Sequence, residues 1–265
     1  MTSPHIANIS VYPIKSFGPT NVSAARIVDG GGLEHDREFA IFDANDKYVN
    51  GKRNTKVHQI TAVIDWKDAT VYFKLLGSTS GPVCFNIRRE IPELESWLSQ
   101  YFDEPVTWRR NSRGGFPDDS LAPGPTIISD ATYLEIATWY SGLAVDEIRK
   151  RFRANIEIGC NEPFWEDHLF TEPGAVVRFK IGEVEFHGTN PCKRCVVPTR
   201  ETLGGESYPD FPKIFMAKRA ETLPSWSTRS RFDHFYRVSI NTRVPHSEIG
   251  KQIHVGDSVE IIGVE

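Results

Sequence analysis

Short runs of β-branched and aromatic residues, separated by polar turns, restrict this chain to a small set of folds. Such runs cover residues 6–12, 22–28 and 39–43 and recur at 236–241 and 255–262 near the end of the chain. Regularly spaced short strands with polar turns are typical of β-sandwiches and β-barrels. The pattern therefore predicts a mainly β fold.

Two segments have the form of hairpins, because a polar turn lies between two strand-like runs. The first pairs residues 39–43 with 47–50, and the second pairs residues 60–66 with 70–76. We expect each pair to form neighbouring antiparallel strands.

Helical periodicity is limited to a few segments, so the predicted class is mainly β with some helix (α+β). Ile91, Leu94, Leu98 and Tyr101 recur at helical spacing, and Pro92 is tolerated in the first turn. Further helices are predicted after a cap at Ser129, Asp130 or Thr132, at 145–152 and at 213–220. Residues 111–125 contain three prolines and two aspartates, which is typical of a loop. We place the domain boundary there, which gives domains at 1–110 and 111–265.

Composition narrows the range of functions. The 265 residues are 39% hydrophobic and 25% charged, as in ordinary globular proteins, and the net charge of −4 gives no general electrostatic case for nucleic acid. We see neither an apolar run of about 20 residues, as a membrane span needs, nor a signal peptide. Four cysteines in such a long chain do not form a disulfide scaffold. We therefore expect a cytoplasmic protein with free thiols and no contact with membranes.

The segment Cys192-Lys193-Arg194-Cys195 carries the clearest chemical signal, since two cations separate two thiols. Nearby positive charge stabilises a thiolate, which is the form that binds metals and acts as a nucleophile. A zinc site would need two more ligands, with His187 close in sequence. A redox dithiol is expected at a helix start, whereas this pair follows a strand. Structurally inert cysteines and a single thiolate ligand for a larger cofactor are the other interpretations.

Three basic motifs lie elsewhere in the chain. Lys15-Ser16 ends the first strand and could hold a phosphate, although an exposed turn lysine is the commoner case. Asp36-Arg37 could equally be a surface ion pair. Arg153 precedes a strand, and its alternative role is that of a basic residue at a helix C-terminus.

The acidic pair Glu166-Asp167 is followed directly by His168. These side chains could form a metal site or an acid–base cluster. We favour a structural carboxylate pair that orients basic residues.

Taken in order, these motifs resemble the MOSC family, named after the C-terminal domain of molybdenum cofactor sulfurase. They are most similar to the branch with an N-terminal β-barrel domain (MOSC_N), as in the mitochondrial amidoxime-reducing component and its bacterial relatives. The matching stretches are Tyr12-Pro13-Ile14-Lys15-Ser16, Gly32-Leu33-Glu34-His35-Asp36-Arg37, Phe152-Arg153-Ala154-Asn155-Ile156, Glu166-Asp167, Cys192-Lys193-Arg194-Cys195 and Val255-Gly256-Asp257.

The resemblance implies two interlocking β-barrel-like domains with the molybdenum cofactor (Mo-molybdopterin) in a cleft between them. It implies that Cys195 is the metal ligand and the catalytic residue. The positions matched to cofactor binding are Lys15, Ser16, Arg37, Ser129, Thr132, Arg153, Asn155, Arg194 and Cys195. We therefore expect Lys15, Arg37 and Arg153 to converge on one cleft.

The resemblance also implies an activity, the molybdenum-dependent reduction of small N-hydroxylated compounds. The chain has no flavin or nicotinamide fingerprint and too few cysteines for an iron–sulfur cluster. Electrons would then come from a separate partner of the cytochrome b5, ferredoxin or flavin reductase type. Two other functions stay open, a sulfur carrier that uses a persulfide on Cys195 and a module that escorts the molybdenum cofactor.

Overall fold

The computed structural model describes residues 3–265, and the largest of its sheets has eight strands. In spatial order, the strands of this sheet are β15 (Val259–Val264), β11 (Val177–Ile181), β12 (Val184–Lys193), β13 (Arg237–Arg243), β9 (Ile127–Ser129), β10 (Ile156–Gly159), β1 (His5–Val11) and β2 (Thr20–Val22). Buried apolar side chains from all but the short β2 strand form one core, and Val22 of β2 packs against it. The first strands of the chain thus lie in the same sheet as strands that follow residue 126.

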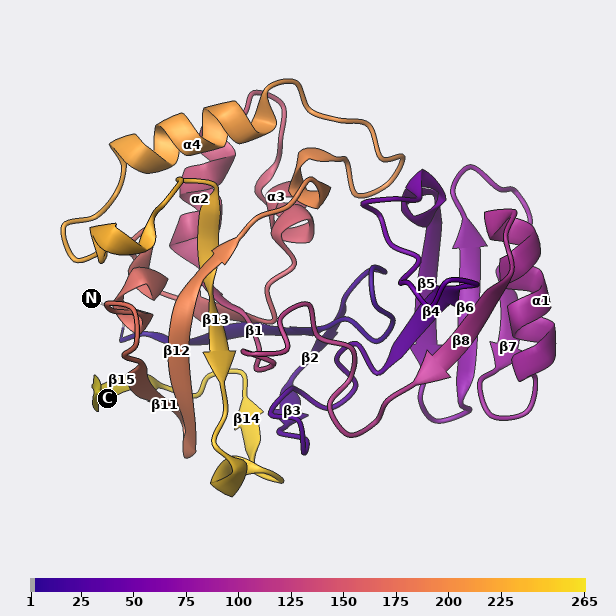
Figure 1. Cartoon of the computed structure of the whole chain (residues 1–265), viewed down its shortest axis with the longest axis horizontal. Coiled ribbons are helices and arrows are strands. Elements are labelled where there is room, and N and C mark those ends of the chain that lie inside the picture. Colours follow the sequence, from indigo (N-terminus) through magenta and orange to yellow (C-terminus); the bar gives the residue numbers. More distant parts are fainter. Residues whose placement is uncertain (1–2) are drawn as a thin grey trace.

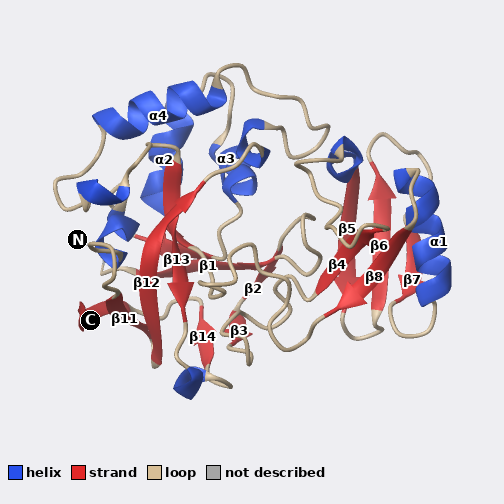
Figure 2. Ribbon diagram, in the orientation of Figure 1, coloured by secondary structure: helices blue, strands red, loops and turns tan. Residues whose placement is uncertain are grey.

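Three smaller sheets complete the strand content. They are β14 (Gln252–His254) with β3 (Ala24–Arg26), β4 (Phe39–Asp43) with β8 (Val106–Arg110), and β5 (Ile60–Asp65) with β6 (Thr70–Leu75) and β7 (Val83–Asn86). A second core lies among β4, β5, β6, β8 and α1 (Ile91–Phe102). In Figure 1 this group stands to one side of the large sheet, and Figure 2 shows its strands beside α1.

Three further helices, α2 (Asp130–Thr138), α3 (Val145–Phe152) and α4 (Phe211–Glu221), gather near one end of β12 and β13 (Figure 1). Ser129 caps α2, since its side chain accepts a hydrogen bond from the Thr132 backbone N–H at 3.2 Å. Arg153 ends α3 in the left-handed conformation, with φ of 55°. No helix within residues 3–265 is both long enough and apolar enough to cross a bilayer.

The predicted α+β class with a majority of strands is confirmed, as are the hairpin of β5 and β6 and the helices at 91–102 and 145–152. The hairpin predicted at 39–50 is confirmed in part. The Asp43 N–H donates to the Lys47 carbonyl at 2.8 Å and the Val49 N–H donates to the Ile41 carbonyl at 2.9 Å, but residues 47–50 form no strand and the ladder partner of β4 is β8. Trp108 of β8 stacks on Phe39 with ring centroids 5.0 Å apart, and Tyr48 packs against Phe42 with centroids 4.8 Å apart. The strands between residues 3 and 265 do not close into a barrel. The division at residues 110 and 111 stays a prediction.

Candidate functional site

Three cations from distant parts of the chain converge where the large sheet meets the β4–β8 group. We call Lys15, Arg37 and Arg153 the cationic cluster. The guanidinium groups of Arg37 and Arg153 lie over the Tyr12 ring, 5.6 Å and 4.2 Å from its centroid. Burial raises the pKa of Tyr12 to about 12, although the charges of Arg153 and Arg37 oppose this shift. The structure thus brings these three predicted residues together.

Arg37 is held by a buried polar network. Its guanidinium donates to Asp36, and the side chains of the pair are 13% and 10% exposed, so the surface ion pair considered from the sequence is wrong. Asn155 is 1% exposed and donates to Asp36 Oδ1 at 2.9 Å and to the Ser10 carbonyl at 3.0 Å. Asp36 also accepts from the Tyr12 N–H at 2.8 Å. Asn155 therefore positions the Asp36–Arg37 pair in this structure, and its amide donors are used by the protein.

Lys15 is buried rather than solvated. Its backbone N–H donates to the Phe39 carbonyl at 2.8 Å, which holds the turn in place. Its ammonium donates to the Phe116 carbonyl at 2.8 Å and to Asp118 Oδ1 at 2.7 Å. Burial lowers the pKa of Lys15, and Asp118 opposes that shift. Ser16, which follows, is half-buried with φ of 77°.

Arg153 differs from the other two cations in its pairing. Among residues 3–265 its guanidinium has neither a hydrogen-bond partner nor an ion-pair partner, and it lies over the Tyr12 ring. Burial lowers the pKa of Arg153. Arg194 extends the positive region, because its charge also opposes the rise that burial causes in the pKa of Tyr12. Its side chain donates a hydrogen bond to the Ser239 hydroxyl. The Nε atom of Arg194 is buried without a hydrogen-bond partner in the described part of the chain. Unpaired buried donors are rare, and they favour an anionic ligand at this place.

Cys195 lies next to Arg194, where β12 ends and a short 3₁₀ helix begins at Val197. Its thiol is half-buried, not part of a disulfide, and accepts a hydrogen bond from the Val197 N–H at 3.4 Å. Cys192 is also free, and its sulfur lies 3.9 Å from the Lys193 carbonyl oxygen. Within residues 3–265, no three His, Cys, Asp or Glu side chains form a metal-binding group.

Ser129 and Thr132 lie in a separate buried network. Both are fully buried, and their hydroxyl groups are 2.7 Å apart. Thr132 donates to Glu166 Oε2 at 2.9 Å, and the Ser129 N–H donates to the same oxygen at 3.2 Å. In this structure both hydroxyl groups are used within the protein, and their role toward a cofactor stays a prediction.

Glu166 should make stability depend on pH. Its burial, and then Asp167, raises its pKa from the ordinary 4.5 to about 7. Between these values the folded state binds more protons than the unfolded chain, so the free energy of unfolding should fall as pH rises, by about 3 kcal/mol in total. Glu166→Gln should flatten this decline in urea unfolding measured from pH 4.5 to 8. The exposed control Glu162→Gln should keep it; an unchanged slope in Glu166→Gln would contradict the assignment.

Asp167 pairs with a cation, as the structural interpretation of Glu166-Asp167 predicted. It accepts from Arg219 of α4 and from the Ser227 hydroxyl, and the side chains of the ion pair are 0% and 1% exposed. Arg219 lies 3.8 Å from the centroid of the Phe164 ring. The pair ties α4 to the 3₁₀ segment Trp165–Leu169 beside β13.

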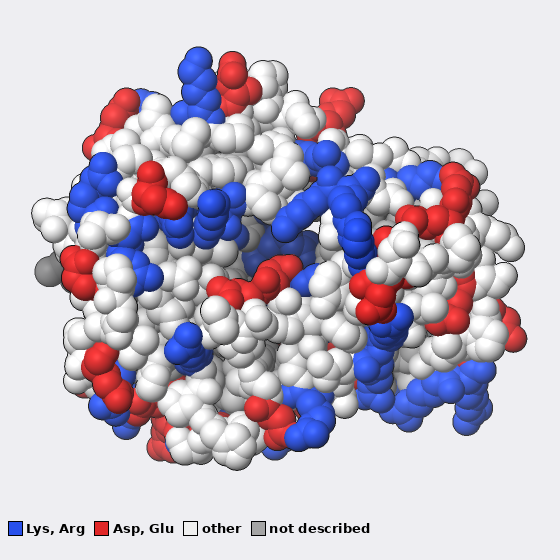
Figure 3. Space-filling view, viewed as in Figure 1, with Lys and Arg blue, Asp and Glu red and all other residues white. Residues whose placement is uncertain are grey.

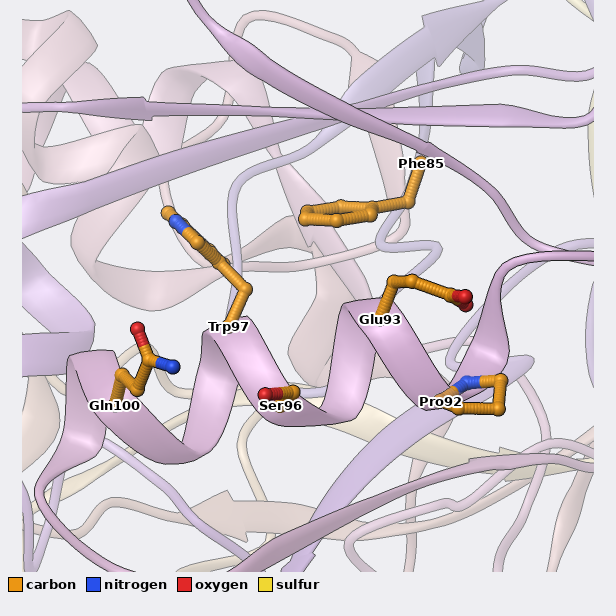
Figure 4. A pocket seen from close by; sticks show the side chains of 6 residues that line it. All are labelled: Phe85, Pro92, Glu93, Ser96, Trp97 and Gln100. Atoms are coloured by element: carbon orange, nitrogen blue, oxygen red, sulfur yellow. The ribbon is translucent and has the colours of Figure 1, made fainter.

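Two hollows of the molecule differ in the side chains that line them. Figure 3 shows a hollow where the two parts of the molecule meet, with Lys and Arg atoms on its floor and upper rim and Asp and Glu atoms on its lower rim. A pocket on α1 is shown in Figure 4, where Phe85 and Trp97 lie over one face of the helix. Its lining residues are Phe85, Pro92, Glu93, Ser96, Trp97 and Gln100. They include no cation and no thiol.

Three residues beside the cationic cluster were not among the predicted site residues. Tyr12 supplies the ring under two of its cations, Asp36 fixes Arg37, and Asp118 contacts Lys15 from a loop. Tyr12 and Asp36 belong to motifs already noted in the sequence. Asp118 had no local signal.

Two family models match the chain. The MOSC N-terminal β-barrel domain matches residues 3–97, and the MOSC domain matches residues 127–260. The chain belongs to the MOSC family. The MOSC domain match contains Arg153, Arg194 and Cys195, and the N-terminal match contains Lys15 and Arg37.

Curated relatives of this MOSC protein include the molybdenum cofactor sulfurases of Drosophila grimshawi, 26% identical over 239 residues, and Caenorhabditis elegans, 25% identical over 230 residues. The alignments cover 78% and 79% of this chain but 29% and 31% of those proteins, so the chain spans less than a third of their length. Among solved structures, the YuaD protein from Bacillus subtilis is 12% identical, with a TM-score of 0.37 over 98% of this chain and 96% of its own.

Proposed function

We propose that this MOSC protein is a molybdenum-cofactor-dependent oxidoreductase that reduces small N-hydroxylated compounds with electrons from a separate partner protein. The observation that supports it most is the cationic cluster, in which Arg153 has no anionic partner among the described residues. A free thiol, Cys195, follows directly after Arg194, whose Nε is also without a partner there. A phosphate-bearing, metal-containing cofactor requires cations that are not already paired and a free thiol that can ionise to bind the metal.

The residues present fit such a cofactor. Lys15, Arg37 and Arg153 would hold its phosphate by charge-assisted hydrogen bonds, and Cys195 would ligate the metal. When bound, the molybdenum would supply two-electron removal of oxygen from the substrate. The protein's own part is to hold the anion, to keep Arg37 oriented through Asp36 and Asn155, and to exclude water from the buried side of the cluster.

A second candidate function is sulfur transfer through a persulfide on Cys195. It is favoured by the name of the related proteins, molybdenum cofactor sulfurase, and by a thiol that is free and partly exposed. A thiol beside a guanidinium group suits either role, because both use the thiolate.

Metal analysis and turnover on the same purified sample should separate the two. The oxidoreductase should contain molybdenum at about one atom per chain and reduce an amidoxime with an artificial reductant or a partner of the cytochrome b5, ferredoxin or flavin reductase type. It should reduce nothing with NADH alone. Labile sulfane sulfur on Cys195 without molybdenum would favour the sulfur carrier, and molybdenum without any turnover would favour an escort role.

A further inference from the structure

The loop of residues 111–125, which we call the cleft loop, is anchored at both ends. At its start, the Phe116 N–H donates to the Arg37 carbonyl at 2.9 Å. Gly115 has φ of +62°, and a Cβ atom there would lie 2.5 Å from the Asp36 carbonyl oxygen, so the close approach needs glycine. At its end, the Gly124 N–H donates to the Thr242 carbonyl at 3.0 Å. The segment between these anchors therefore has a defined place beside the cationic cluster.

Asp118 lies in the middle of the cleft loop and reaches into the cationic cluster. Its two carboxylate oxygens are 2.7 Å from Lys15 Nζ and 3.7 Å from Arg37 Nε. Partial desolvation raises the pKa of Asp118, but Arg37, Lys15 and Arg153 outweigh it and bring the pKa below its ordinary value. The carboxylate is therefore ionised at neutral pH; it contacts Lys15 and Arg37, and the charge of Arg153 acts on it without an ion-pair contact.

The side chain of Asp118 is nevertheless 69% exposed, whereas that of Lys15 is 7% exposed. A carboxylate that is open to solvent can turn away into water, and the contacts that it then gives up are those with Lys15 and Arg37. By contrast, Asp36 is 10% exposed and fixed by Tyr12 and Asn155, so it is a permanent partner of Arg37.

We infer that Asp118 is a built-in, displaceable anion that occupies the phosphate position of the cationic cluster and sets how tightly the cluster binds phosphate-bearing ligands. A phosphate group must displace this carboxylate from Lys15 and Arg37, while the unpaired Arg153 offers the first contact. This inference rests on the proposed function, in which the cluster holds a phosphate.

The inference can be tested by calorimetric titration of inorganic phosphate into the whole chain purified without bound cofactor, in low-chloride buffer. Asp118→Asn keeps the shape of the side chain and removes its charge, so it should tighten phosphate binding by about ten- to a hundredfold. The matched control is Asp119→Asn, because Asp119 is the adjacent carboxylate and contacts Asn241 at 3.3 Å instead of the cluster. It should change binding less than twofold.

Arg153→Ala in the same titration separates this inference from the proposed function. If Arg153→Ala weakens binding and Asp118→Asn does not tighten it, Asp118 is not a competing anion, but the cluster remains the anion site. If neither variant changes binding, both the inference and the placing of a phosphate at the cluster are overturned. An equal gain in Asp118→Asn and Asp119→Asn would also overturn the inference, because it would show a general effect of net charge.

Discussion

Replacing Cys195 by serine should abolish molybdenum-dependent reduction and remove most of the bound metal. A neutral hydroxyl group is a poor substitute for a soft thiolate ligand. Cys195 is free, partly exposed, and next to Arg194, whose charge extends the cationic cluster. Metal content by elemental analysis and amidoxime reduction with an artificial reductant measure both losses on one sample.

Cys192→Ser is the matched control for this prediction, because it removes the same atom three residues away. It should keep the metal and a substantial part of the activity, since the proposed function assigns the metal to the thiolate of Cys195 alone. A reversible disulfide between the two cysteines would make both variants behave alike. Equal loss in both variants would therefore defeat the assignment of Cys195 as the single ligand.

The sequence was sufficient to predict the cationic cluster but not the anion inside it. Lys15, Arg37 and Arg153 belong to motifs whose resemblance to the MOSC family implied one common site. Asp118 lies 103 positions after Lys15, in a loop whose composition predicts irregular backbone and nothing more. Its contact depends on how the cleft loop is anchored to residues 37 and 242, and no local pattern encodes that anchoring.

The same distinction explains the fold. Local signals predicted β5 with β6 and the span of α3, and they gave Ser129 as one of three possible caps of α2, because turn chemistry and side-chain periodicity act over a few residues. The partner of β4 depends on a stack between Phe39 and Trp108, which are far apart in the sequence. The strand order of the large sheet likewise follows from long-range pairing, such as that of β15 with β11.

The ion pair between Asp167 and Arg219 offers a test of stability that is independent of the cofactor. Arg219 is fully buried against the rings of Phe164 and Phe232, at 3.8 Å and 5.1 Å from their centroids. Its Nε and Nη1 atoms have no hydrogen-bond partner among the described residues, so the pairing with Asp167 is its main compensation for burial. Removing one partner of such a pair leaves a buried charge without compensation.

Arg219→Met should therefore lower the free energy of unfolding by about 3–5 kcal/mol, measured by urea denaturation at neutral pH. Lys218→Met is the control on the same helix, since Lys218 is 47% exposed and pairs with the exposed Glu221; it should change stability by less than about 0.5 kcal/mol. The double variant Asp167→Asn with Arg219→Met should recover part of the loss, because no charge is then left unpaired. Molybdenum per folded chain should stay the same in all three. If Arg219→Met were as stable as Lys218→Met and lost activity instead, the pair would belong to the chemistry of the site, as the acid–base interpretation of Glu166-Asp167 requires.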